Sequence, residues 1–538
     1  MSTTAVRAEP PPQRASLAQS ILAFPSRVVA VFSGPIGFAL KIVLLAVSNA
    51  VAIWAAVILV GEEKWIAVAV LVATTLFIDW AYMSKRSLAL KFLIPGTVLL
   101  LAFQVIPILY TVNVAFTNYS TGHILSKSEA IDGIKGNTLA PPANGKTYLM
   151  TPARDADGNL VLLLADEATG QTYVGTKEGL TPIPKSDVQV DDLGIAGAKG
   201  YTAIKGTEFA AIDRELSNFT VPTEGDAAIR PEGLDSATEL APTLRYDAAN
   251  DQFVRISNGT VFADNGRGSF VATNGEELEP GWKTSVGFRN FDKIINNPLV
   301  RDPFLRVFVW TFAFAFLCVG ISFALGLFMA IVLDRPGMRF QRGYRILLVL
   351  PYAIPGFLSL LVWQGLLNDD FGVVNQLLHI DVPWLFDSNW AKVSVILVSV
   401  WLTFPYFFLV SLGALQSIPA ELTEAARVDG GGPWQVFRKV TLPLLFIVVA
   451  PLLIASFAFN FNNFGVIYFL TGGGPQSSDQ TTAGDTDILI SYTYKLAFSS
   501  GKGQDYALAS AVAMIIFFIT AVIAAIGFWR TKQLENVR

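Results

Sequence analysis

A short run of polar and aromatic side chains interrupts a long apolar stretch near the C-terminal end of the chain. Ser456, Asn460 and Asn463 recur at spacings of four and three residues with Phe459 beside them, which predicts that all four share one helix face, whereas Asn462 should point elsewhere. Amides both donate and accept hydrogen bonds, and aromatic rings pack against apolar C–H groups. This neutral set suits an uncharged ligand rich in hydroxyl groups, such as a sugar. Hydrogen bonding between neighbouring helices is the alternative.

A second segment of this kind, residues 401–406, lies in the preceding apolar stretch and reads Trp-Leu-Thr-Phe-Pro-Tyr. Pro405 lacks a backbone N–H and should kink or open a helix there. In a membrane helix such a break frees backbone groups for contacts with a ligand or a neighbouring helix. Both segments are therefore candidates for lining one site.

Residues typical of catalysis or metal binding are few. Cys318 is the only cysteine, and His123 and His379 are far apart with no cluster of ligands around either, so neither a disulfide nor a metal site is expected. The nearest match to a phosphate-binding loop is residues 145–147, Gly-Lys-Thr, but Ala140 stands where the motif needs its first glycine. We expect no cofactor on this chain and no enzymatic activity of its own; any ATP would be bound by a partner.

The composition indicates a helical membrane protein that holds these segments within spans. The chain has 538 residues, of which 52% are hydrophobic and only 15% charged, against about a quarter charged in soluble domains. A membrane helix needs about 20 apolar residues. Eight stretches qualify, at 37–61, 65–84, 90–113, 304–333, 344–367, 391–415, 444–470 and 506–529.

Basic residues predict the orientation of these spans. Lys and Arg are concentrated in the N-terminal segment, the C-terminal segment and the alternate loops between them, whereas the short loops on the other side contain only Lys64, Lys495 and Lys502. Cytoplasmic loops carry the excess of Lys and Arg. Both termini are therefore expected in the cytoplasm.

A long polar segment, residues 119–300, separates the third and fourth spans and is expected outside the cytoplasm. Short alternating runs among Gly, Asp and Asn, such as 252–256, indicate strands and turns. The predicted fold is an all-α membrane protein with eight transmembrane helices and one inserted β-rich or α+β domain. The predicted organisation is a disordered cytoplasmic tail (1–36), three helices (37–118), the insert (119–300), a five-helix core (301–530) with a cytoplasmic loop (416–443), and a tail (531–538).

The polar loop at 421–443 resembles a known motif. Glu424-Ala425-Ala426, then Gly430 and then Leu442-Pro443, at these spacings, resemble the EAA loop of bacterial ABC importer permeases, with Val440 where isoleucine is usual. In that family the loop forms a coupling helix that sits in a cleft of the ATPase subunit. The resemblance implies ATPase coupling by Glu424, Ala425, Ala426, Asp429, Gly430, Leu442 and Pro443.

The large insert of an eight-span permease, with residues 282–291 just before the fourth span, is similar to the larger membrane subunit of the maltose/maltodextrin ABC importers. That resemblance implies a sugar site formed by Leu402, Thr403, Tyr406, Ser456, Phe459, Asn460 and Asn463. Thr403 stands where that family has glycine, which would alter the sugar that fits. The implied partners are a second permease subunit, an ATPase dimer holding ATP and Mg, an extracytoplasmic sugar-binding protein, the oligosaccharide and membrane lipid, but no nucleic acid. The implied location is the bacterial inner membrane.

Two other classes of protein are less well supported by the sequence. A secondary transporter should carry ionisable residues in mid-span and repeated halves, but Asp79 is the only clear acid within a predicted span and lies near one end of it. A membrane-bound enzyme or sensor would need a catalytic cluster or a cytoplasmic signalling domain, and neither is visible. Within the importer class, trehalose or another neutral glycoside is an alternative to a maltose-like sugar.

Overall fold

The computed structural model describes residues 34–84, 88–191, 194–204, 208–223, 225–335, 338–476, 482–499 and 503–535. It divides into two compact units, Met1–Leu109 and Tyr110–Arg538. Most of the tail predicted at 1–36, and the last three residues of the one predicted at 531–538, lie outside the described residues.

The first unit is made of apolar helices whose described side chains are exposed or partly exposed, except Ala81 and Ile94, as expected for helices that face lipid. A three-residue turn joins the first two helices, and Asn49 of one donates a hydrogen bond to Asp79 of the other at 3.0 Å. The elements are α2 (Pro35–Gly61), α3 (Trp65–Met83), α4 (Leu88–Leu100), a π-helical turn (Leu101–Val105) and α5 (Ile106–Ala115), which continues into the second unit.

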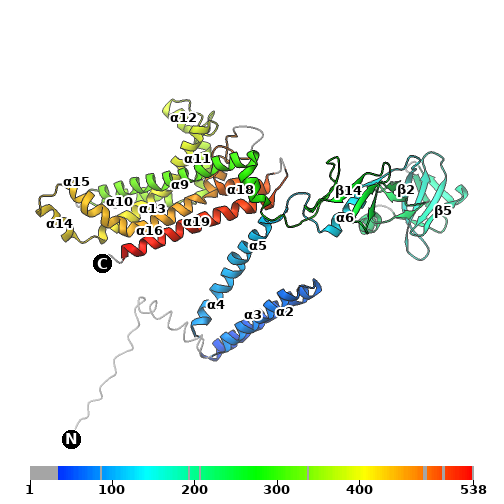
Figure 1. Cartoon of the computed structure of the whole chain (residues 1–538), viewed down its shortest axis with the longest axis horizontal. Coiled ribbons are helices and arrows are strands. Elements are labelled where there is room, and N and C mark those ends of the chain that lie inside the picture. The colour runs from blue at the N-terminus through cyan, green and yellow to red at the C-terminus, as the bar shows by residue number, and fades with distance from the viewer. Residues whose placement is uncertain are drawn as a thin grey trace, which may run out of the picture. The chain divides into compact units, whose positions relative to one another are not determined.

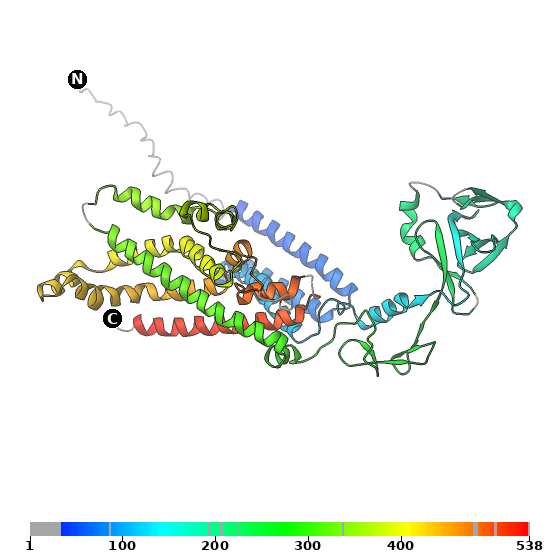
Figure 2. The same ribbon diagram turned by 90° about the horizontal axis from the view of Figure 1, so that it is seen from above.

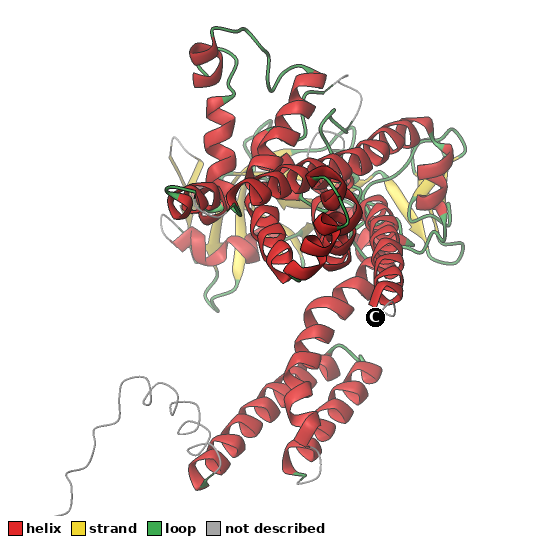
Figure 3. Ribbon diagram, turned by 90° about the vertical axis from the view of Figure 1, so that its left-hand side faces the viewer, coloured by secondary structure: helices red, strands yellow, loops and turns green. Residues whose placement is uncertain are grey.

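The inserted domain contains the described strands of the chain (Figure 3), all of them paired antiparallel. One sheet runs in the order β5-β4-β3-β2-β11-β10-β9, with β1 paired to β11 and β8 paired to β2. A second sheet runs β12-β13-β14-β15, and β6 pairs with β7. The strands are β1 (Leu139–Ala140), β2 (Thr147–Arg154), β3 (Leu160–Asp166), β4 (Thr172–Thr176), β5 (Gly179–Ile183), β6 (Val188–Asp191), β7 (Gly194–Ala198), β8 (Thr202–Ala203), β9 (Val221–Pro222), β10 (Ala228–Pro231), β11 (Ser236–Pro242), β12 (Leu244–Asp247), β13 (Gln252–Arg255), β14 (Val261–Asp264) and β15 (Phe270–Ala272).

Two helices and two apolar cores complete this domain. Helices α6 (Lys127–Asn137) and α7 (Phe209–Ser217) pack beside the sheets. Strand β3 is buried along most of its length and anchors the core of the larger sheet, whereas Phe253, Phe262 and Phe270 form the core of the smaller one. The prediction of a β-rich insert is confirmed.

The helical core follows the insert and begins with a short helix and then a 36-residue helix. Figures 1 and 2 show α9, α13, α16 and α19 running along one common direction. Helices α9 and α13 approach closely because Gly326 has no side chain: a Cβ there would lie 2.6 Å from the Phe408 nitrogen. The helices are α8 (Arg289–Asn296), α9 (Pro298–Leu333), α10 (Gln341–Ala353), α11 (Gly356–Leu366), α12 (Val373–Leu378), α13 (Ser388–Ser417), α14 (Ala420–Val428), α15 (Pro433–Val436), a π-helical turn (Phe437–Thr441), α16 (Leu442–Phe461), α17 (Phe464–Leu470), α18 (Leu489–Phe498) and α19 (Tyr506–Glu535).

Two predicted spans differ from straight helices. Within the described residues, seven helices are long and apolar enough to cross a membrane, and the pair α10–α11, bent by 92°, makes up to eight. The span expected at 344–367 breaks before Pro355, which cannot donate a helical hydrogen bond. The span expected at 444–470 ends its long helix at Phe461 and restarts at Phe464. Both breaks lie beside the cavity described next.

Candidate functional site: a neutral cavity in the helical core

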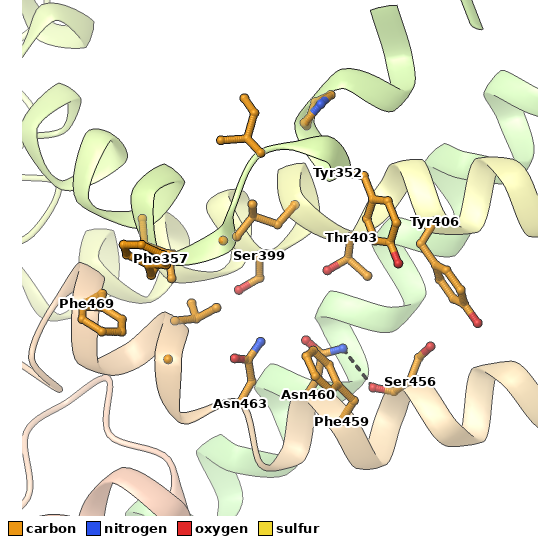
Figure 4. Close-up of a pocket in the computed structure, with 17 residues that line it drawn as sticks. Tyr352, Phe357, Ser399, Thr403, Tyr406, Ser456, Phe459, Asn460, Asn463 and Phe469 are labelled. Carbon is orange, nitrogen blue, oxygen red and sulfur yellow. Dashed lines mark hydrogen bonds between the residues drawn. The ribbon is translucent and has the colours of Figure 1, made fainter. Parts of the chain in front are cut away.

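A cavity of about 530 Å³ lies where the α10–α11 bend meets α13, α16 and α17 (Figure 4). This volume falls within the usual range for small-molecule sites, about 300–1,000 Å³. The structure brings together all seven residues predicted to contact a ligand: Leu402, Thr403, Tyr406, Ser456, Phe459, Asn460 and Asn463. Ten further residues line it: Pro351, Tyr352, Ile354, Gly356, Phe357, Leu360, Ser399, Gly465, Val466 and Phe469.

Helix α13 supplies one wall of the cavity. Ser399, Leu402, Thr403 and Tyr406 lie three, one and three residues apart, so the helical repeat places them on the same side. The helix continues through Pro405. The Pro405 ring nonetheless removes one donor of the helical ladder, next to the side chains that face the cavity.

Asn460 is the most constrained polar group of the opposite wall. Its side chain is fully buried, and its Nδ2 donates a hydrogen bond to the Ser456 backbone oxygen at 2.9 Å (Figure 4). Its Oδ1 accepts no hydrogen bond from any described residue. A buried acceptor without a partner costs free energy. The hydroxyl of a ligand in this cavity would relieve that cost.

Asn463 reaches the same cavity by a route that spacing alone did not predict. It was expected on the helix face of Ser456 and Asn460, but α16 ends two residues earlier and Asn463 lies in the break, at φ −80° and ψ 70°. The break is held by hydrogen bonds from the Asn463 N–H to the Asn460 carbonyl, 3.2 Å, and from the Phe464 N–H to the Asn462 carbonyl, 2.8 Å. The neighbouring Asn462 is exposed, bonds to the Ala458 carbonyl and is absent from the lining, as predicted.

The lining carries no formal charge: none of its members is Asp, Glu, Lys, Arg or His. Its polar groups are hydroxyls and amides, and its rings come from Tyr352, Phe357, Tyr406, Phe459 and Phe469. Such a surface can hydrogen-bond hydroxyl groups and pack rings against the apolar face of a sugar. It offers nothing to neutralise a charged ligand.

Sequence reasoning missed the residues contributed by the α10–α11 bend. Tyr352 and Phe357 flank Pro355 and enter the cavity because the chain turns by 92° between them. The signal was present in the sequence, since Pro351 and Pro355 both interrupt one apolar stretch, and interrupted spans are pointers to binding sites in membrane transporters.

The loop predicted to couple to an ATPase forms a compact surface of its own, at the end of α13 and the start of α16. Helix α14 ends at Val428 with Asp429 as its C-cap, Gly430 adopts φ +86°, and α15 then begins at Pro433 (Figure 1). Glu424 and Ala425 are exposed, whereas Ala426 and Leu442 are partly buried and Pro443 is exposed. Two large apolar side chains also face outward, Val428 at 87% and Trp434 at 69% exposure. The loop thus joins α13 and α16, which carry six of the seven predicted ligand contacts; the seventh, Asn463, follows the end of α16.

Comparisons with known proteins agree with this architecture. Residues 322–532 match the binding-protein-dependent transport system inner membrane component, and residues 98–178 match the N-terminal region of the transmembrane subunit of binding-protein-dependent ABC transporters. A crystal structure of a bacterial ABC transporter for the import of alginate aligns at 22% identity with a TM-score of 0.40, over 46% of this chain and 84% of that one. A TM-score this low supports no inference.

Curated relatives extend over nearly the whole chain. The maltose/maltodextrin transport system permease protein MalF of Vibrio vulnificus (strain YJ016) is 33% identical over 85% of this chain and 88% of its own length. The protein of the same name from Escherichia coli (strain K12) is 33% identical over 86% of this chain and 91% of its own. These relatives are transport components of the membrane, not enzymes. The chain belongs to the MalF family and is a multi-pass inner membrane permease subunit of a binding-protein-dependent ABC importer.

Proposed function

We propose that this chain carries a neutral, maltose-like oligosaccharide across the membrane after an extracytoplasmic binding protein delivers it. The observation that carries the proposal is the charge-free cavity with the unpartnered Asn460 oxygen at its wall. The names of the relatives, which are maltose/maltodextrin permeases, supply the class of sugar.

The side chains of the cavity divide into two roles. Asn460, Asn463 and Ser456 hydrogen-bond the hydroxyls of the sugar, and Tyr406 and Phe459 pack against its apolar faces. Leu402 and Thr403 shape the α13 wall. Because Thr403 places a methyl and a hydroxyl group in the cavity, it is the position at which we expect this chain to set its preference among neutral sugars.

ATP and Mg act in a separate ATPase dimer. We infer that the loop Ala420–Val436 inserts into that partner, with Val428 and Trp434 buried at the contact and Glu424 and Gly430 fixing its geometry. Closure of the ATPase pair would then move the adjoining ends of α13 and α16. Because these helices also hold the cavity, the motion would alternate its access between the two sides of the membrane.

A second permease subunit completes the pathway, and the insert faces the binding protein. The distribution of Lys and Arg supports cytoplasmic termini and a cytoplasmic coupling loop. The insert of residues 119–300 then lies outside, where a binding protein would meet it.

A sugar panel tests the proposal. The tagged chain is purified with its partners and reconstituted in proteoliposomes with the binding protein. ATP-dependent uptake is then measured for maltose, maltotriose, trehalose and a charged disaccharide. Uptake of maltose and maltotriose but not of the charged sugar supports the proposal. Preference for trehalose would leave the importer assignment intact and would replace a maltose-like sugar by trehalose as the substrate. A chain that never co-purifies with an ATPase would exclude the importer mechanism.

A further inference from the structure

The described residues of the last outer loop, 471–476 after α17 and 482–488 before α18, pack around a buried ion pair. The Asp487 side chain is fully buried and Lys495 is 16% exposed, with Nζ and Oδ2 2.6 Å apart. The same carboxylate accepts hydrogen bonds from the Gly484 N–H at 2.7 Å and from the Ser491 hydroxyl at 2.8 Å. Both carboxylate oxygens are therefore satisfied, and the pair has a single well-defined geometry.

The backbone at Gly473 lies directly against this pair. Gly473 adopts φ +80°, and a Cβ built there would be 2.0 Å from Asp487 Oδ1 and 2.5 Å from Lys495 Nζ. A Cβ on Gly484 would likewise lie 2.0 Å from the Gly473 carbonyl oxygen. Only glycine fits at either position, so the two sides of the loop touch through their backbones at the ion pair.

The loop is in turn tied to the cavity and to α9. Gly473 follows three residues after the end of α17, the helix that contributes Val466 and Phe469 to the cavity lining. The Thr471 hydroxyl, next to the end of α17, lies 2.8 Å from the Thr486 hydroxyl on the other side of the loop. On the far side of the loop, Trp310 and Thr311 of α9 contact it: Trp310 Nε1 donates to the Thr486 carbonyl at 3.2 Å, and the Thr311 hydroxyl accepts from the Leu489 N–H at 2.9 Å.

Stability alone does not account for such a pair. Burial is the largest influence on the Asp487 carboxyl and raises its pKa, against the opposing effects of Lys495, Gly484 and Ser491. A buried ion pair is often no more stabilising than apolar side chains of the same volume, although removing one partner is strongly destabilising. What it does supply is one fixed arrangement of the groups around it.

We propose that Asp487 and Lys495 are a positioning pair that holds α17, and with it Val466 and Phe469, at the wall of the sugar cavity. The inference rests on the proposed function, because it assigns the cavity to sugar. Neither side chain touches the ligand. The pair acts through Gly473 and the adjoining end of α17.

Two glycines provide a matched test. Gly473 and Gly472 both have positive φ, +80° and +59°, so alanine strains the backbone at either position, but only at Gly473 does the new Cβ meet the ion pair. The variants Gly473→Ala and Gly472→Ala are compared in the reconstituted complex with its binding protein. Lys495→Met and the conservative Lys495→Arg form a second pair.

The measurement is the amount of maltose taken up per ATP hydrolysed, together with subunit co-purification and binding-protein-stimulated ATPase activity. We expect Gly473→Ala and Lys495→Met to lower the uptake per ATP by about fivefold or more. Gly472→Ala and Lys495→Arg should stay within about twofold of wild type, within the spread of substitutions that disturb no key contact. Assembly and stimulated ATPase activity should be retained in both glycine variants and in Lys495→Arg, whereas Lys495→Met, which leaves Asp487 buried and unpaired, should also lower the yield of assembled complex.

Three results would overturn the inference. The first is an equal loss of uptake per ATP in each variant and its matched control, and the second is unchanged uptake per ATP in Gly473→Ala and Lys495→Met. The third is failure of both Gly473→Ala and Lys495→Met to assemble, which would make the pair a general requirement for folding. Failure of the proposed function is distinguishable, because wild-type complex would then take up no sugar. If wild type transports and the variants match their controls, only the positioning role is wrong.

Discussion

Replacing Asn460 by leucine separates sugar binding from stability. The substitution removes an amide that donates to the Ser456 carbonyl and whose Oδ1 is buried without a partner. A lost hydrogen bond costs about 0.5–1.5 kcal/mol, and removing an unsatisfied buried acceptor recovers about 1–3 kcal/mol. The two effects nearly cancel, so Asn460→Leu should assemble and melt close to wild type.

Sugar transport should respond quite differently. With sugar present, leucine leaves at least one hydroxyl unpaired in the cavity, at a cost of about 1–3 kcal/mol, or about 5–150-fold in affinity. The assay is retention of radiolabelled maltose by the complex trapped with ADP and vanadate, read beside its melting temperature. Asn462→Leu is the matched control, because Asn462 is exposed and lies outside the cavity lining. Equal retention by both variants, or loss of assembly in Asn460→Leu alone, would refute the assignment of Asn460.

Three further predictions concern the coupling loop, the insert and the orientation. Glu424→Lys should uncouple ATPase activity from transport while leaving assembly at least partly intact; normal transport would refute docking at this loop. Lys127 lowers the pKa of Asp251, so their pairing contributes stability above the unfolded pKa of about 3.9 and loses it as the pH falls through the lower folded value. Asp251→Asn should therefore lower the melting temperature of the complex at pH 7 by more than it does at pH 3, and a pH-independent difference would contradict this. Because Cys318 is buried, Val428→Cys in a chain expressed without its ATPase partner should react with an impermeant maleimide in inverted vesicles but not in intact cells; the reverse would overturn the orientation.

The coupling loop was the part of the fold best predicted by the sequence. Its residues are consecutive, and glycine and proline act locally, so Gly430 and Pro433 mark the helix end and the helix start that the structure contains. The sequence also predicted the neutral, polar character of the cavity, because uncharged amides in an apolar stretch are unusual. All seven predicted residues line one cavity.

The sequence did not predict the elements that depend on distant parts of the chain. The break at Asn462 and Asn463 has no proline to mark it and lies where α11, α13 and α17 pack together. Pro355 does mark the 92° bend, but the sequence does not say how far or in which direction the chain turns there. Strand order shows the same limit: alternation predicted strands, but β2 pairs with β11, about ninety residues further along the chain, as well as with its neighbour β3. The contribution of Tyr352 follows from the bend and was missed with it.

The most direct test of the account is ATP-dependent maltose uptake by proteoliposomes that contain this chain, its permease partner and the ATPase, with the binding protein outside. The account predicts uptake that requires both ATP and the binding protein, and that falls sharply with Asn460→Leu but not with Asn462→Leu. Uptake that continues without the ATPase, or that is indifferent to Asn460, would contradict it.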